Sequence, residues 1–172
     1  GAARNTQTFA LVGRTETSPD SWKEFEPSTA TLTITYNHPP ATPTGLSTTP
    51  ATSCAATPPP VVGDADVYLY APVSDPDGGS LGVRFELWKT SAPATILASS
   101  NAATFTATSA TTAILVIPRA TLEAAADSLT QFSWHVQTTD TLTTTAWSAT
   151  CSFNFDTSRP GQPGVDQPAI GP

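Results

Sequence analysis

The sequence predicts an all-β fold, an antiparallel β-sandwich preceded by an extra pair of strands. Thr, Val, Ile and aromatic residues recur along the chain, and these types suit the pleated, half-buried surface of a sheet. The 172 residues include 17 Pro and 10 Gly, which favour frequent turns. Short segments alternate between apolar and polar residues, as strands with one buried face do.

Charge and hydropathy narrow the range of functions. Charged residues make up 12% of the chain, the formal net charge is −7 and the pI is about 4.5. The seven basic residues are scattered from Arg4 to Arg159, so the basic stripe that a nucleic-acid-binding protein needs is missing. No run of about 18 apolar residues is present, and we expect no membrane-spanning helix.

Cys54 and Cys151 are the two cysteines, 97 positions apart. In a Thr-rich β-chain of low charge, they predict a disulfide and an oxidising compartment. Closing so long a loop stabilises a fold by about 4–5 kcal/mol in the chain-entropy model. The alternative is a pair of buried free thiols. A zinc site is not expected, because two Cys and the distant His38 and His135 lack zinc-ligand spacing.

The first 37 residues are predicted to form two strands, Thr8–Val12 and Thr31–Tyr36. The second alternates strictly, with Leu32, Ile34 and Tyr36 on one face. Two strands bury too little surface to be stable alone, so this head is expected to pack on something else. Residues 38–50 are rich in Pro and are interpreted as a stiff, extended linker without ladder hydrogen bonds.

Residues 51–157 are predicted to form the sandwich. Pro58, Pro59 and Pro60 favour an edge or a switch between sheets. Arg119–Leu129 is the only helix-like stretch, expected to carry the chain across one end. The predicted strands cover 66–73, 82–88, 95–98, 104–106, 114–117, 132–137 and 151–155. The predicted core consists of Val83, Phe85, Leu87, Ile114, Val116, Trp134, Val136, Phe153 and Phe155.

The two termini suggest a larger parent protein. Residues 158–172 are rich in Pro and Gly and are interpreted as a second linker or tail. The chain contains no Met, so we interpret it as an interior piece of a longer precursor.

Several motifs occur in an order that resembles a known family. They are the Asp75–Gly78 turn, Phe85–Trp88, Phe132–Val136 followed by Asp140, and Ala146–Ser148. Residues from about 39 to 157 resemble the immunoglobulin-like or fibronectin-III-like repeats of actinobacterial surface and secreted proteins. The resemblance implies a sandwich repeated in tandem. The chain departs from antibody domains because Cys54 precedes the early strand, so the bridge should tie the first edge to the last strand.

Residues 5–37 separately resemble the end of a bacterial DNRLRE-type domain, a β-sandwich related to carbohydrate-binding modules. The matching residues are Phe9, Leu11, Glu16, Trp22, Lys23, Phe25, Leu32, Ile34 and Tyr36. Only the closing strands of such a domain are present, so the resemblance assigns no sugar-binding residue here.

Candidate catalytic residues are few. His38 lies in the linker and His135 on an outward strand position, with Asp140 nearby. Nucleophilic catalysis needs a base within hydrogen-bond reach of a Ser or Cys, and no Gly-Xaa-Ser-Xaa-Gly, phosphate-binding or His-Glu-Xaa-Xaa-His motif is present. We therefore expect no enzyme and no catalytic residue. A solvated strand histidine is the simpler interpretation of His135.

Two ligand sites are conceivable from residue types. Asp75 and Asp77 before Gly78 resemble part of a calcium loop, to which Asp64 and Asp66 could add oxygen ligands, although Asp and Gly also suit a plain turn. Calcium is the one cofactor that these residue types suggest. Three tryptophans could form aromatic platforms for sugars or pack at edges and domain contacts; they are Trp22, Trp88 and Trp147.

The sequence predicts a non-catalytic structural or adhesive module of a secreted or cell-surface protein. Neighbouring domains or further copies of the chain are the expected partners, and strand addition to an exposed edge would give a filament. The alternative is a carbohydrate-binding accessory module of a secreted hydrolase, with polysaccharide as its partner.

Overall fold

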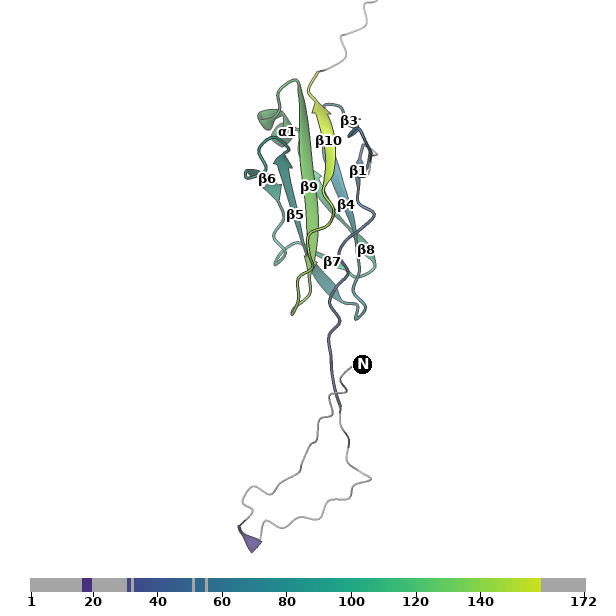
Figure 1. Cartoon of the computed structure of the whole chain (residues 1–172), viewed down its shortest axis with the longest axis vertical. Helices are drawn as coiled ribbons and strands as arrows, with labels where there is room; N and C mark the ends of the chain where they lie inside the picture. The colour runs from purple at the N-terminus through teal and green to yellow at the C-terminus, as the bar shows by residue number, and fades with distance from the viewer. Residues whose placement is uncertain (1–16, 20–30, 32, 51, 55, 159–172) are drawn as a thin grey trace, which may run out of the picture. The chain divides into compact units, whose positions relative to one another are not determined.

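A computed structural model describes residues 17–19, 31, 33–50, 52–54 and 56–158. Its contacts divide the chain into two compact units, Gly1–Tyr36 and Asn37–Pro172. We call the described part of the second unit the two-sheet unit. The strands and the α-helix of the described residues all lie in this unit (Figure 1).

The described residues of the first unit form no strand. Ile34 and Tyr36 are 68% and 71% exposed, so the predicted alternation over Thr31–Tyr36 buries no face within the part described. An apolar alternation produces a strand only where a partner sheet covers it. The predicted strand Thr8–Val12, together with Leu32 and Trp22, lies outside the described residues.

The regular elements of the two-sheet unit are β-strands, apart from one short helix. Its elements in chain order are β1 (Ser47–Thr49), β2 (Thr52–Ser53), β3 (Val61–Val62), β4 (Val67–Val73), β5 (Ser80–Lys89), β6 (Ile96–Ser99), β7 (Thr106–Thr108), β8 (Thr111–Ile117), α1 (Arg119–Ala125), β9 (Leu129–Thr139) and β10 (Cys151–Asp156).

The strands form two sheets. One has the order β2-β1-β4-β8, and the other has the order β3-β10-β9-β5-β6, with β7 also pairing with β5. The pairs between named strands are antiparallel except β3 with β10, which is parallel. The chain crosses from the first sheet to the second between β2 and β3. Pro58–Pro60, for which the sequence favoured an edge or a strand switch, lie in this crossing, and β3 after them is an edge strand.

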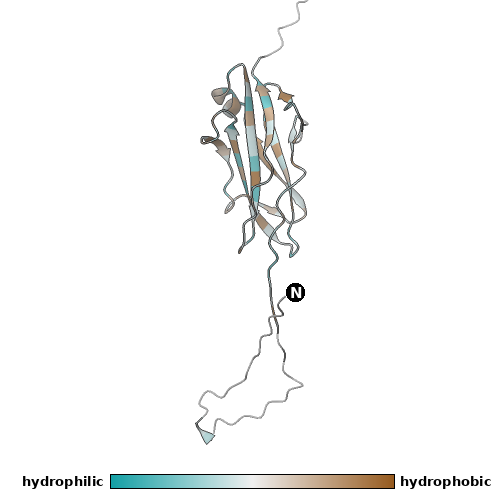
Figure 2. Ribbon diagram, in the orientation of Figure 1, coloured by the Kyte–Doolittle hydropathy of each residue, from teal (hydrophilic) through white to brown (hydrophobic). Residues whose placement is uncertain are grey.

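One core fills the space between the sheets. Alternate residues of each long strand are buried, so hydrophobic and hydrophilic residues alternate along the ribbons (Figure 2). The largest fully buried side chains are Trp134, Phe85, Phe132, Phe153, Phe155, Leu69, Leu81, Leu87, Ile117, Leu122, Val62 and Val67. Seven of the nine predicted core residues are buried.

The two exceptions lie on β8. Ile114 and Val116 are 43% and 44% exposed, whereas Ala113 and Ile117 are buried, so the predicted phase of this strand is wrong. A continuous apolar run carries no alternation to reveal its inward face. The register decides it: β8 is the last strand of its sheet and Leu115 faces the buried Leu69 of β4.

Two further elements differ from the prediction. The segment interpreted as a linker, residues 38–50, contains β1, which pairs with β4 through Ser47–Thr49. Leu46, just before β1, is buried in the core. The helix is shorter than predicted, because α1 begins after Pro118 and ends at Ala125. Leu122 is its buried anchor.

The predicted disulfide is present. Cys54 and Cys151 are bonded, with 4.6 Å between their Cα atoms. Cys54 follows β2, the edge strand of the four-stranded sheet, and Cys151 opens β10 in the other sheet. The bond therefore joins the two sheets and ties the first edge to the last strand, as expected from the sequence.

Among the described residues, no helix is both long and apolar enough to cross a membrane.

Candidate functional site

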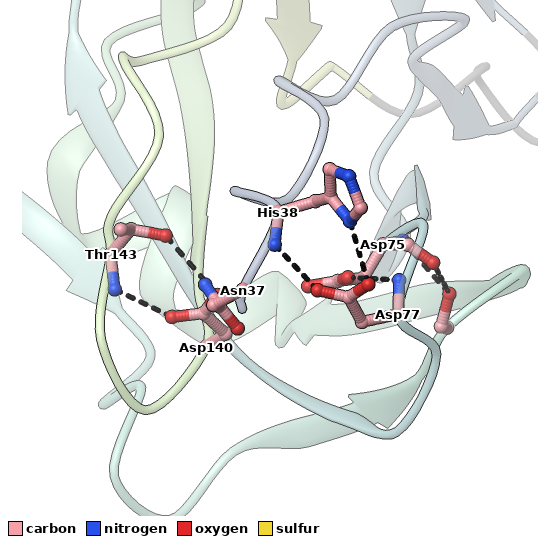
Figure 3. A network of polar contacts seen from close by, with 7 residues as sticks. Asn37, His38, Asp75, Asp77, Asp140 and Thr143 are labelled. Carbon is pink, nitrogen blue, oxygen red and sulfur yellow. Dashed lines mark hydrogen bonds and ion pairs between the residues drawn. The ribbon is translucent and has the colours of Figure 1, made fainter. Parts of the chain in front are cut away.

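The chain enters the two-sheet unit beside two turns, which together form what we call the entry clasp (Figure 3). The Asn37 side chain donates to Asp140 Oδ2 at 2.8 Å. The His38 backbone N–H donates to Asp77 Oδ2, and His38 Nδ1 lies 2.8 Å from Asp77 Oδ1. Asp77 follows β4 and Asp140 follows β9, so the clasp connects the incoming chain to both sheets.

The β4–β5 turn holds Asp77 in place. The Asp77 N–H donates to Asp75 Oδ1 at 2.7 Å, and the Gly78 N–H donates to the Asp75 carbonyl at 3.1 Å. Gly78 and Gly79 have φ angles of +76° and +84°, a region that Gly adopts without steric cost. Ser109 fixes the turn to the β7–β8 connection, because its hydroxyl accepts from Asp75 N and donates to Asp75 O.

Asp140 is the acceptor at the centre of the second turn. The N–H groups of Leu142 and Thr143 both donate to its Oδ1, and the Thr143 hydroxyl donates to its Oδ2. Hydrogen bonds from Asn37, Thr143 and Leu142 lower the pKa of Asp140 to about 2. The side-chain and backbone hydrogen bonds of His38 likewise lower the pKa of Asp77 below its usual range. Both carboxylates are therefore ionised at neutral pH.

The four acidic residues considered for calcium do not converge. Asp75 and Asp77 lie in one turn, where their carboxylates already accept the hydrogen bonds described. Asp64 and Asp66 lie at the opposite end of β4, where both contact Arg119. Within the described part of the chain, no group of three or more His, Cys, Asp or Glu residues has the arrangement of a metal site.

The structure brings together two of the three tryptophans proposed as sugar platforms. On the outer face of the larger sheet, the His135 ring stacks on Trp147 with centroids 3.8 Å apart, and Trp88 meets it edge-on at 4.7 Å. Glu86 Oε2 lies 3.1 Å from His135 Nε2, and the Arg84 guanidinium lies 5.7 Å from the Trp147 ring centroid. We call these five residues the aromatic cluster.

A polar cavity of about 380 Å³ adjoins the aromatic cluster at Arg84. Its other lining residues are Ser99, Ser100, Asn101, Ala102, Gln137, Thr138, Thr139 and Thr144. Gly82 lies under the segment that forms one wall, and a Cβ there would come within 2.3 Å of the Ala102 carbonyl oxygen. That close approach requires Gly, because any larger residue would push the wall away from β5.

Sequence reasoning named several of these residues without their partners. His38, Asp77 and Asp140 were each noted, but Asn37 and Asp140 are 103 positions apart, and no local pattern relates them. His135 was interpreted as a solvated strand residue, whereas it lies half-buried between two indoles and a carboxylate. The register of the sheet brings Glu86 to His135, since these residues oppose each other on β5 and β9, and no sequence signal gives that register.

The chain was compared with models of protein families, with curated proteins and with solved structures, and no match was found in any of the three. Its function is therefore inferred from its residues and their geometry.

Proposed function

We propose that this chain is a non-catalytic structural or adhesive module of an extracellular or cell-surface protein, with an immunoglobulin- or fibronectin-III-like β-sandwich. The observation that carries the proposal is the placement of the two attachment points of the two-sheet unit. The chain enters beside the turns after β4 and β9 and leaves at the end of β10, beside the start of β9 (Figure 1). The attachment points are therefore at opposite ends.

Both attachment points are bonded to the unit. At the exit end, the Thr157 N–H donates to the Ser128 carbonyl at 3.1 Å, and the Thr157 hydroxyl donates to the Asp127 carbonyl. Asp156 accepts from the N–H and hydroxyl of Ser158. At the entry end, the clasp engages Asn37 and His38. A module held at opposite ends in this way separates whatever precedes it from whatever follows it, as a spacer does.

The disulfide supports the same proposal. Cys54–Cys151 adds covalent strength, and such bonds persist in oxidising surroundings outside the cytosol. An extracellular spacer needs this kind of stability because it meets proteases and has no chaperones to refold it.

The spacer function is tested with two full-length chains joined in tandem. Small-angle scattering should give a distance distribution with two separated maxima, one within each two-sheet unit and one between them. A variant with Asn37→Ala and His38→Ala is the matched control, since it removes the clasp side chains and leaves the disulfide. Its second maximum should broaden. A single compact maximum from the parent tandem would contradict the spacer function.

Strand addition between copies has a defined edge available to it. β8 is a terminal strand of the four-stranded sheet, and its seven residues include no charged residue and no Pro. Uncharged edge strands of this length are templates for pairing with another chain. We propose β8 as the edge used if copies assemble. Sedimentation should show concentration-dependent association that Val116→Lys abolishes; a monomer at all concentrations would exclude this route.

A carbohydrate-binding module is the second candidate, favoured by the aromatic cluster and the adjoining polar cavity. Indole rings stack on sugars, while Asn101 and Gln137 offer amides to hydroxyl groups. The test is calorimetric titration with soluble polysaccharides that carry neutral and acidic sugars. Binding that is lost in Trp147→Ala, and retained in Leu142→Ala, would support this function. If no polysaccharide gave a binding heat, the carbohydrate-binding function would be excluded.

A further inference from the structure

The two terminal strands of the two-sheet unit run in the same direction. β4 starts at the exit end and finishes at the entry clasp, and β1 pairs with it antiparallel, so β1 runs from entry to exit. β9 starts at the exit end, and β10 pairs with it antiparallel, so β10 also runs from entry to exit. Tension applied between Asn37 and Ser158 therefore pulls β1 and β10 along their own axes and in opposite directions.

This geometry loads the ladders in shear. Antiparallel hydrogen bonds lie perpendicular to the strands, so tension along β1 or β10 acts across all bonds of the ladder together. β10 is paired with β9 over six residues, Cys151–Asp156, and with β3 on its other side. Phe153 and Phe155 also anchor it in the core. To separate β10 from the unit, all hydrogen bonds of its ladder must break and both Phe side chains must leave the core together.

The disulfide lies on the load path. Asn37 and Cys54 are 17 positions apart in the sequence, and Cys151 and Ser158 are seven positions apart. A covalent route between the two attachment points therefore uses about 24 residue lengths and bypasses the 97-residue loop. The strands inside that loop are β3 to β9, with α1.

We propose that Cys54–Cys151 carries tension around the core, so that this module limits its own extension under load. When the chain is pulled, the clasp, β1, β2 and β10 can be drawn out, and the bond then stops further lengthening. The core between the two cysteines is never stretched. The use of this property at a cell surface rests on the proposed spacer function, whereas the property itself depends only on the disulfide and the two strand directions.

The test is force spectroscopy on the full-length chain, tethered at its two ends, with and without the bond. Releasing the loop adds 97 residues to the extensible chain, which is about 330 Å at 3.3–3.6 Å per residue. We expect the oxidised protein to have a contour length shorter than the Cys54→Ala, Cys151→Ala variant by that amount. Equal contour lengths would overturn the proposal.

A second measurement uses the wild-type chain alone, in case the variant does not fold. Oxidised molecules are held under constant tension after the first lengthening, and dithiothreitol is added. A single further step equivalent to about 330 Å of chain should follow as the bond is reduced. No step, or the same total length before and after reduction, would refute the bypass. The Asn37→Ala, His38→Ala variant is the control, because its total contour length should equal that of the wild type.

The two proposals fail separately. A tandem that folds into one compact particle in the scattering experiment, but still shows the length difference, would remove the spacer function and keep the mechanical bypass. Two separated maxima in the scattering experiment, together with equal contour lengths under force, would support the spacer function and show that the disulfide does not carry the tension.

Discussion

The two ends of the two-sheet unit are held by different kinds of contact. Asn37 and His38, at the entry, are exposed and bind Asp140 and Asp77 through polar side chains. The exit strand β10 instead buries alternate side chains and begins at the disulfide. Exposed polar contacts of this kind contribute little to stability, whereas truncating a buried aromatic side chain costs about 3–5 kcal/mol. The exit end therefore contributes more to stability than the entry end does.

The largest effect should come from the disulfide. The Cys54→Ala, Cys151→Ala variant should lose about 4–5 kcal/mol of unfolding free energy, because the 97-residue loop is no longer constrained in the unfolded chain. Denaturant unfolding of the variant and of the oxidised protein measures this. The reduced wild type should match the variant. A loss below about 1 kcal/mol would show that β10 is held by its packing alone.

The next effect should come from the core of the exit strand. Phe155 is fully buried and meets the Phe132 ring edge-on, with ring centroids 6.3 Å apart. Phe155→Ala should cost about 3–5 kcal/mol in unfolding free energy, through lost burial and the cavity left behind.

The matched control lies at the entry end. Leu142 is 73% exposed in the turn that carries Asp140, and Leu142→Ala keeps the backbone N–H that donates to it. Its unfolding free energy should stay within about 0.5 kcal/mol of the wild type. If Phe155→Ala and Leu142→Ala lost the same unfolding free energy, the two ends would not differ in their contribution to stability.

A smaller effect should come from backbone packing near the entry end. A Cβ on Gly82 would lie 2.3 Å from the Ala102 carbonyl oxygen, so Gly82→Ala must displace backbone and should cost about 1–3 kcal/mol. At Gly63 nothing lies within 4 Å of an added Cβ, so Gly63→Ala should be neutral or slightly stabilising. Thermal unfolding of both variants compares them. If Gly82→Ala and Gly63→Ala have the same melting temperature, the wall of the polar cavity does not approach β5 as closely as this distance requires.

The smallest effect concerns the entry clasp and pH. The pKa of Asp140 in the folded chain is lowered from 3.8 to about 2, first by the hydrogen bond from Asn37. The contribution of this carboxylate to stability is thus fully present above pH 3.8 and is lost as the pH falls through about 2. Asp140→Asn should be less stable than the wild type at neutral pH, with a difference that shrinks between these two values. Unfolding curves of both proteins across this range test it, and a difference independent of pH would contradict the assignment.

Local sequence patterns predicted several strands of the two-sheet unit and their buried faces. The alternation in Val83–Leu87, Phe132–Val136 and Cys151–Phe155 identified three strands and their buried faces, since a strand with one covered face must alternate. The disulfide followed from there being only two cysteines. Pro58–Pro60 indicated where the chain changes sheets, because Pro interrupts a ladder.

The candidate site was only partly predictable. Trp88 and Trp147 were named as a possible platform, but the contact of Trp88 with the His135 ring depends on β5 lying beside β9. Likewise, the entry clasp depends on two turns that the sheets place together. Neither the pairing of strands nor the proximity of distant turns has a local signal in the chain.

The sequence by itself determined the secondary-structure class, the long alternating strands β5, β9 and β10 and the disulfide, because these depend on residue type and on short-range periodicity. Tertiary structure alone decided which face of β8 is buried, that residues 47–49 add a strand, and that the incoming chain bonds to both sheets. These features depend on which strands lie next to each other. That arrangement is determined by the burial of the apolar faces of all the strands in one core, which no short stretch of sequence specifies.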